Sequence, residues 1–283
     1  MRIACVQADV VFNDPNANSR FLIEKLAELK EGGVEFAVFP EAFLTGYCVD
    51  DEAAAKEIAI EAAVDQNGEI VKMNPALEAI RDACERLEMG CVVGFAGFDG
   101  EGLFNAAALF EPGRAPRRFL KVHLPYLGYD RFVRGGDDLP VFETRWGKIG
   151  ILICYDQRPP EGARVLGLKG ADLIVLPTNW PIGAEVSAEY MSIARAAENR
   201  VFFATCDRVG VENGVKFIGL SKIIDIGGKV LAAAGDTEAT LIADLDLARA
   251  RDKKIVNIPG EYEMDLVNSR KPELYGVIGA PIQ

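Results

Sequence analysis

Histidine is almost absent from this chain of 283 residues, since His123 is the only one. A Ser-His-Asp or Cys-His pair would have to use this single residue, and a metal cage built from several histidines is disfavoured. If the protein is a hydrolase, carboxylates and lysine are expected to carry its proton transfers. Cysteine is also sparse: the six cysteines include no C-x-x-C pair, which argues against a disulfide framework.

Positive charge is in deficit, with 31 Lys and Arg against 43 Asp and Glu and a net charge of -12. Nucleic acid or an anionic membrane would call for a basic patch, so neither is expected as a partner. No apolar run reaches the roughly 18 residues that span a bilayer, and Asp9 interrupts the N-terminal stretch before a signal segment could form. No G-x-G-x-x-G follows the first predicted strand, which argues against a nucleotide-binding protein. These absences predict a cytoplasmic protein.

Apolar strands alternate with amphipathic helices along the chain. Helices are predicted over 19–30, from Asn74-Pro75, from Pro159-Pro160 and over 185–199. Strands are predicted over 3–8, 36–39, 91–98, 106–110, 117–122, 149–153, 173–176, 201–206, 221–225 and 230–233. This order predicts a mixed α/β sheet with helices on its faces, in one domain over residues 1–246. Residues 247–283 are expected to form a C-terminal tail that packs on the domain or on a neighbouring subunit.

Two charged residues, Glu41 and Lys121, follow apolar strands. Glu41 stands among aromatic residues, and desolvation there would raise its pKa toward the range of a general base. A helix-cap or salt-bridge glutamate is the alternative. Lys121 would be a fixed positive charge suited to an oxyanion if it faces inward, or an ordinary edge lysine if it faces water. His123, two residues on, either supports the site by hydrogen bonding or is simply a packed residue, and the second interpretation is favoured.

Cys154 follows the apolar run 149–153 and lies just before a predicted helix. A turn from strand to helix exposes a nucleophile and offers backbone N–H groups as an oxyanion hole. The helix N-terminus and a nearby lysine would both favour the thiolate. Cys5, Cys84, Cys91 and Cys206 are interpreted as buried structural residues, whereas polar Asp156, Gln157 and Arg158 follow Cys154 at once.

Taken in order, these segments resemble the nitrilase superfamily of carbon–nitrogen hydrolases. The resemblance covers residues 1 to about 246. It is carried by Phe39-Pro40-Glu41, Leu120-Lys121-Val122-His123-Leu124-Pro125, Ile153-Cys154-Tyr155-Asp156, Leu176-Pro177-Thr178-Asn179-Trp180, Arg195-Ala196-Ala197-Glu198-Asn199 and Phe217-Ile218-Gly219-Leu220-Ser221.

The resemblance implies a four-layer αββα sandwich, assembly into homodimers or larger homo-oligomers, and a site without a cofactor or metal. It implies that Glu41 is the general base and that Cys154 attacks the amide carbon. Lys121 and the backbone N–H of Tyr155 would hold the oxyanion. Glu41 would then protonate the departing amine and activate water for thioester hydrolysis.

One position departs from the family pattern. Many members carry a second glutamate a few residues after the lysine, whereas Asp130 is the only carboxylate in the corresponding stretch of this chain. Asp130 either takes over the positioning role or only pairs with Arg131 or Arg134. Tyr47, Trp180, Tyr126 and Pro181 are candidate pocket walls by motif position.

The dipeptide Tyr155-Asp156 resembles the amidase and carbamoylase branches, because dedicated nitrilases typically show Trp-Glu there. A small amide is therefore the predicted substrate. An N-carbamoyl amino acid amidohydrolase is the alternative, with Arg158 or Arg131 as the cation for the substrate carboxylate. A nitrilase and a catalytically silent binding member are disfavoured.

Overall fold

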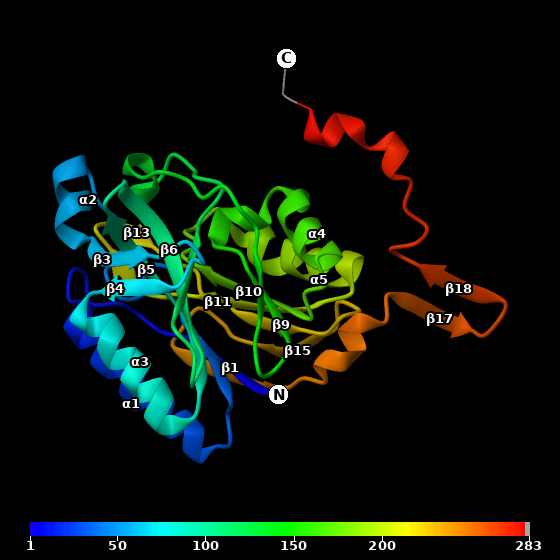
Figure 1. The fold of residues 1–283 in the computed structure, drawn as a ribbon, viewed down its shortest axis with the longest axis horizontal. Coiled ribbons are helices and arrows are strands. Elements are labelled where there is room, and N and C mark those ends of the chain that lie inside the picture. The colour runs from blue at the N-terminus through cyan, green and yellow to red at the C-terminus, as the bar shows by residue number, and fades with distance from the viewer. Residues whose placement is uncertain (281–283) are drawn as a thin grey trace.

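The computed structural model describes residues 1–280 and contains two sheets that pack face to face, with helices on their outer faces (Figure 1). The eight-stranded sheet comprises β1 (Arg2–Gln7), β2 (Phe36–Val38), β3 (Ile60–Val64), β4 (Ile70–Met73), β5 (Gly90–Asp99), β6 (Gly102–Phe110), β7 (Arg117–Leu120) and β16 (Ala239–Asp244). The six-stranded sheet comprises β8 (Val141–Glu143), β9 (Lys148–Ile151), β10 (Leu173–Thr178), β11 (Phe202–Asp207), β14 (Lys222–Ile224) and β15 (Val230–Ala233).

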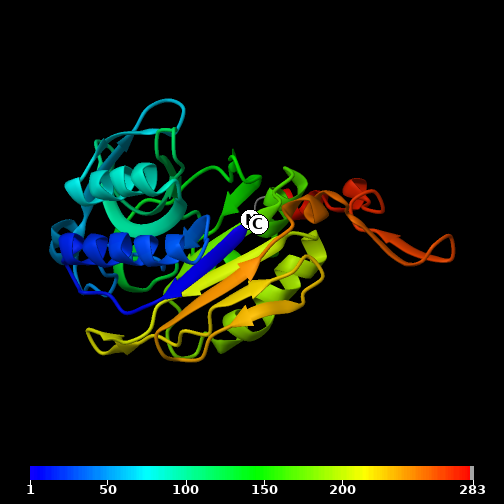
Figure 2. The same cartoon turned by 90° about the horizontal axis from the view of Figure 1, so that it is seen from below.

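Helices cover both sheets. The helices are α1 (Pro15–Glu31), α2 (Glu52–Ile58), α3 (Pro75–Leu87), α4 (Pro160–Leu168) and α5 (Ser192–Asn199). Figure 2 shows α1 and α3 beside the eight-stranded sheet and α4 and α5 beside the other one. As predicted, α3 begins with an asparagine cap, and the Asn74 side chain accepts a hydrogen bond from the backbone N–H of Ala76 (2.9 Å).

The side chains of β10 show how the layers are built. Leu173 and Val175 lie in the core between the two sheets, whereas Ile174 and Leu176 pack in the core under α4 and α5. A strand buried on both faces needs apolar residues at every position, which is why this segment reads as a continuous apolar run. The predicted α/β class and the αββα layers are confirmed.

Parallel strands bring several chain segments to one edge of the molecule. In the six-stranded sheet, Ile151 of β9 pairs with Val175 of β10, and Thr178 at the end of β10 pairs with Asp207 at the end of β11. In the other sheet, β1, β2 and β5 are parallel. Residues that follow β2 and β9 therefore leave the sheets at their carboxyl ends, where ligands of open α/β sheets bind.

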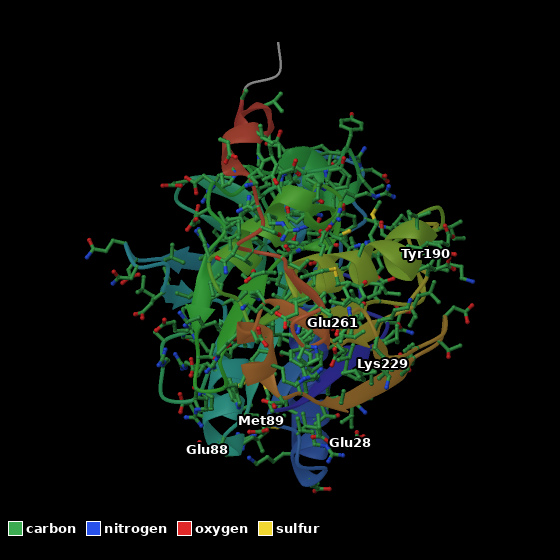
Figure 3. The ribbon with its side chains drawn as sticks, turned by 90° about the vertical axis from the view of Figure 1, so that its right-hand side faces the viewer. Glu28, Glu88, Met89, Tyr190, Lys229 and Glu261 are labelled. Carbon is green, nitrogen blue, oxygen red and sulfur yellow. The ribbon has the colours of Figure 1, made fainter. Side chains whose placement is uncertain are left out.

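The chain after residue 246 is more structured than its lack of periodicity suggested. It forms a hairpin of β17 (Lys254–Ile258) and β18 (Tyr262–Asp265), and Figure 1 shows this segment reaching away from the body. Figure 3 faces the side from which it projects, with Glu261 at the hairpin turn. Because both faces of the hairpin are largely exposed, no alternation of apolar and polar residues marks it. The boundary at residue 246 stays a prediction.

A second short hairpin, of β12 (Val211–Glu212) and β13 (Val215–Lys216), lies outside the two large sheets. Within residues 1–280, none of the helices combines the length and the apolar character that a membrane crossing requires.

Candidate active site

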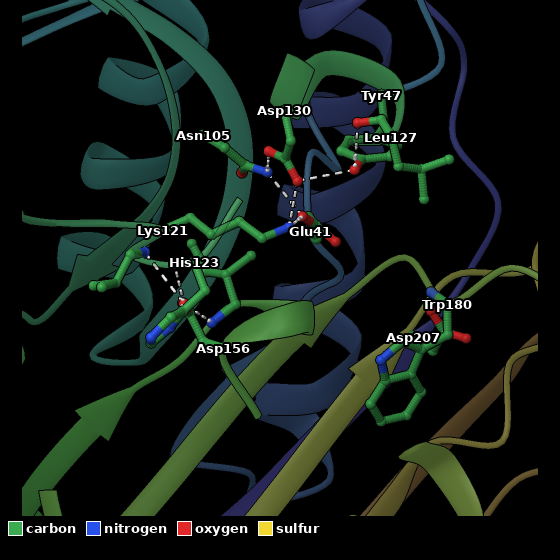
Figure 4. A network of polar contacts seen from close by, with 12 residues as sticks. Glu41, Tyr47, Asn105, Lys121, His123, Leu127, Asp130, Asp156, Trp180 and Asp207 are labelled. Atoms are coloured by element: carbon green, nitrogen blue, oxygen red, sulfur yellow. Dashed lines mark hydrogen bonds and ion pairs between the residues drawn. The ribbon is translucent and has the colours of Figure 1, made fainter. Parts of the chain in front are cut away.

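A fully buried lysine forms the centre of the site. Lys121 directly follows β7, and its backbone N–H donates to the carbonyl of Asn105 (2.9 Å). Its Nζ donates to Glu41 Oε1 (2.7 Å) and to Asp130 Oδ2 (2.5 Å), with all three side chains withdrawn from solvent (Figure 4). Burying charged groups costs desolvation free energy, which their hydrogen bonds must compensate. Here the lysine ammonium donates to two different carboxylates.

Two further side chains complete the hydrogen bonds of this cluster. The Asn105 amide nitrogen donates to Glu41 Oε1 (2.8 Å) and to Asp130 Oδ1 (2.8 Å). The Tyr47 hydroxyl lies within hydrogen-bonding distance of Asp130 Oδ2 (2.9 Å) and of the Leu127 carbonyl (3.0 Å). Asp130 thus faces three donor groups.

Glu41 is placed by a tight turn after β2. The backbone of Ala42, the next residue, is left-handed (φ 46°), and a Cβ at Gly94 would lie 2.5 Å from Glu41 Cα. Only glycine at position 94 therefore lets β5 approach the turn this closely. Burial raises the pKa of Glu41, and the charge of Asp130 adds to the rise, while Lys121 and Asn105 oppose it.

The protonation of the neighbouring groups follows from the same charges. Burial disfavours the Lys121 ammonium, but the two carboxylates outweigh it and raise the lysine pKa well above its ordinary value. Burial, followed by the charges of Asp130 and Glu41, raises the pKa of Tyr47 well above its usual range. The cluster therefore holds a charged lysine and a neutral phenol at neutral pH.

Cys154 follows β9 at the first position of the short 3-10 helix Cys154–Gln157, with a left-handed backbone (φ 46°). A non-glycine residue in this conformation is strained, as nucleophiles on sharp turns are. The expectation of a thiolate is wrong for the free protein. Burial and the Glu41 charge raise the pKa of the thiol, and Lys121 only partly offsets them. The thiol is therefore neutral at rest and requires a base.

Asp156 ties the cysteine turn to the lysine segment. Its Oδ2 accepts from the backbone N–H of Ile153 (3.0 Å), and its Oδ1 accepts from the backbone N–H of His123 (2.7 Å) and of Val122 (3.2 Å). The ring Nδ1 of His123 lies 2.9 Å from the same Oδ1, and this hydrogen bond raises the pKa of the histidine. His123 thus supports the loops that carry the site.

The family follows from comparison with known proteins. The carbon–nitrogen hydrolase family matches residues 2–255 of this chain. The chain belongs to the carbon–nitrogen hydrolase family. The predicted resemblance to the nitrilase superfamily is thereby confirmed, and the protein is a hydrolase acting on carbon–nitrogen bonds.

Relatives of this carbon–nitrogen hydrolase include both nitrilases and amidases. A nitrilase of Pyrococcus abyssi is 33% identical over 276 residues, covering 97% of this chain and 99% of the relative. The 2-oxoglutaramate amidase of Bacillus subtilis is 30% identical over 256 residues, covering 88% and 92%. A solved structure of a mutant amidase from Nesterenkonia sp. AN1 is similar with a TM-score of 0.79 at 25% identity, covering 97% and 95%. It shows the acetamide moiety of fluoroacetamide added covalently at the active-site cysteine.

The predicted pocket walls of the hydrolase occupy different positions. Trp180 is buried, packs in the core under α4 and α5, and donates its backbone N–H to Asp207 Oδ1 (2.8 Å). The Tyr47 ring lies near the Lys121 ammonium, with its centroid 5.8 Å from Nζ. Tyr126 is 90% exposed and lines a cavity of about 220 Å³ at the surface, so its role as a wall of the site stays a prediction.

Tyr155 is 40% exposed, and its backbone N–H has no hydrogen-bond partner within residues 1–280. An N–H group next to the nucleophile and free of partners suits the predicted oxyanion role. Within residues 1–280, no group of three or more His, Cys, Asp or Glu side chains is arranged to hold a metal ion.

Sequence reasoning missed Asn105 and gave Asp156 no structural role. Asn105 is the one carboxamide in the apolar run of β6, and a buried polar residue inside such a strand is a signal that could have found it. Asp156 served only to indicate the enzyme branch. The arginines proposed as alternative partners of Asp130 bind elsewhere: Arg131 contacts the carbonyls of Gly128 and Val49, and Arg134 contacts Asp99.

Proposed function

We propose that this carbon–nitrogen hydrolase cleaves a small amide through a thioester on Cys154, releasing ammonia or an amine and a carboxylate. The observation that carries the proposal is the buried Lys121 ammonium fixed between two carboxylates beside a cysteine on a strained turn. A buried lysine–carboxylate ion pair without a neighbouring nucleophile would suit a structural role equally well. A neutral thiol next to a carboxylate of raised pKa suits general-base activation.

In the first half of the reaction, Glu41 takes the thiol proton as the sulfur attacks the carbonyl carbon. The carbonyl electrons move onto oxygen, where Lys121 and the N–H of Tyr155 stabilise the negative charge. Glu41 then gives its proton to the nitrogen as the C–N bond breaks. In the second half, Glu41 takes a proton from water as the water oxygen attacks the thioester carbon, and it returns that proton to the sulfur as the C–S bond breaks.

Asp130 has a positioning role in this proposal. Its contact with Nζ lies opposite that of Glu41, so the ammonium is held even while Glu41 carries a proton. This is the role proposed for it in place of the second glutamate that many family members carry. The shorter aspartate reaches the lysine because it lies on the buried turn Gly128–Phe132, which Tyr47 anchors.

An amide is favoured over a nitrile by Tyr155-Asp156 and by relatives described as 2-oxoglutaramate amidase and omega-amidase. An N-carbamoyl amino acid amidohydrolase is the second candidate. Arg131 supports it, because it lines a cavity of about 220 Å³ together with Cys48 and Asn213. Arg158, exposed four residues after Cys154, is the other candidate cation.

We also propose assembly into a homodimer or larger homo-oligomer and a cytoplasmic location. The projecting C-terminal hairpin, with Val256, Ile258 and Tyr262 about half exposed, supports contact with another subunit. Six free cysteines support a reducing compartment.

A substrate panel tests the activity. Aliphatic amides, ω-amides, ureido acids and nitriles are assayed for ammonia release with the wild type and with Cys154→Ala. We expect release from at least one amide by the wild type and none by the variant. Ammonia from ureido acids alone would assign the carbamoylase alternative. Equal release by Cys154→Ala would refute the proposed nucleophile.

A further inference from the structure

The two carboxylate oxygens of Glu41 have different surroundings. Oε1 accepts from Lys121 Nζ (2.7 Å) and from Asn105 Nδ2 (2.8 Å). Oε2 is buried and has no hydrogen-bond partner within residues 1–280. A buried carboxylate oxygen without a donor is the more basic of the two, because protonating the other would cost it a charge-assisted hydrogen bond.

Asn105 can hold Oε1 in only one orientation of its amide. Its Nδ2 donates to both Glu41 and Asp130, whereas its Oδ1 is buried without a partner in the described chain. Rotating the amide by 180° would turn its oxygen toward two carboxylates, so their charges fix it as drawn in Figure 4.

The backbone of Asn105 is equally constrained. The residue lies within β6, pairs with Ala96 of β5, and accepts the N–H of Lys121 with its carbonyl. The side chain therefore projects from the middle of a sheet, which positions a group more accurately than a loop does.

We propose that Asn105 is a positioning residue that occupies Glu41 Oε1, so that Oε2 is the oxygen exchanging protons with Cys154 and with the departing amine. The inference rests on the proposed function and specifies its proton path. As the S–H bond breaks, an Oε2–H bond forms and the sulfur electron pair bonds the carbonyl carbon. The same proton then moves from Oε2 to nitrogen, which takes the C–N electron pair.

Loss of the Asn105 amide would have two consequences. Glu41 Oε1 would then be held by Lys121 alone, so the carboxylate would spend less time in the productive orientation. The hydrogen bond from Asn105 also lowers the pKa of Glu41, so its removal moves that pKa upward. The ionisable groups whose charges or contacts face Glu41 are Lys121, Asp130, Tyr47, Cys48, Cys154 and Asp207.

The test compares Asn105→Ala and Asn105→Ser with a matched control, Asn199→Ala. Asn199 is also a buried asparagine whose Nδ2 donates while its Oδ1 has no partner in the described chain, but it lies at the end of α5. The readouts are kcat and KM on the amide found in the panel, the acid limb of kcat/KM against pH, and the thermal unfolding midpoint.

For Asn105→Ala we expect kcat to fall about 10- to 100-fold, the effect of one hydrogen bond to a charged group, with KM within a few-fold. The acid limb should move to higher pH, because Glu41 must be ionised to accept the thiol proton. Asn105→Ser, which keeps one donor, should lie between Ala and wild type. Asn199→Ala should lower the unfolding midpoint without moving the acid limb or kcat.

An unchanged acid limb in both Asn105 variants, with kcat within about three-fold of wild type, would overturn the inference. So would an equal shift in Asn199→Ala. If Asn105→Ala does not fold, the Asn105→Ser profile decides alone. Failure of the proposed function is distinct, because Cys154→Ala would then still release ammonia whatever the Asn105 variants do.

Discussion

Replacing Lys121 by methionine removes the one positive charge between Glu41 and Asp130 while keeping a similar volume. Both carboxylates are fully buried, so the variant leaves two like charges joined only through Asn105. Removing one partner of a buried ion pair typically costs about 3–5 kcal/mol of stability. Because two carboxylates lose their counter-ion here, we expect the upper part of that range at pH 7, together with loss of amide hydrolysis.

The stability loss should depend on pH in a defined direction. Without Lys121, burial and mutual repulsion raise the pKa values of the carboxyl pair above the unfolded value of about 4. A carboxyl group whose folded pKa is raised destabilises the protein as pH rises from the unfolded value through the folded one. The deficit of Lys121→Met relative to wild type should therefore be largest near pH 7 and shrink toward pH 4.

Urea unfolding of both proteins at pH 4 to 7, followed by intrinsic fluorescence, measures this difference. Lys25→Met is the control, since Lys25 forms an exposed pair with Glu28 that should contribute under about 1 kcal/mol at any pH. A deficit for Lys121→Met that is the same at pH 4 and pH 7 would refute the reasoning, because the two carboxylates would then not be its cause.

Three further predictions follow from the same geometry. Cys154 should be the first cysteine alkylated by a small dose of iodoacetamide, because it is partly exposed and Glu41 can take its proton, whereas the other five are buried; labelling spread evenly in the mass spectrum would contradict this. Asp130→Asn should lower kcat about 10-fold or more by weakening the hold on Lys121, and turnover within a few-fold of wild type would remove Asp130 from the site. Glu212→Gln should destabilise the protein by about 2 kcal/mol, because it removes one of the two carboxylates, Glu212 and Asp9, that pair with the fully buried Arg208 and weakens the hydrogen bonds from the N–H groups of Tyr47 and Cys48; a thermal midpoint within 1 °C of wild type would count against it.

The site residues that could be predicted from the sequence are those that follow a strand, whereas the one that was missed lies inside a strand. Glu41, Lys121 and Cys154 each follow an apolar run, and a polar residue after such a run is visible without coordinates. Asn105 lies within β6, and nothing in the sequence states that its amide faces Glu41 and Asp130. Partners in a hydrogen-bond network are set by strand register, which single-sequence patterns do not contain.

The thiol pKa was mispredicted for a similar reason. The sequence indicates a nearby lysine and a following helix, which favour a thiolate, but neither the depth of burial nor the distance to Glu41 can be read from it. In the structure the helix is one short 3-10 turn, Cys154–Gln157, and the acidic neighbour outweighs the basic one. Whether a cysteine is ionised is thus decided by tertiary contacts.

A neutral thiol also fits the charge of the site as a whole. Glu41, Asp130 and Lys121 together carry one net negative charge, and a resting thiolate would add a second one in a buried environment. In the proposed attack, Glu41 becomes neutral as the oxyanion forms, so the sum stays at one negative charge. Lys121 meanwhile keeps its contact with Asp130 and is not left unpaired when Glu41 is protonated. A second carboxylate on the lysine therefore lets the proton move while the net charge of the buried site stays constant, which is cheaper in a low dielectric than creating or removing a charge.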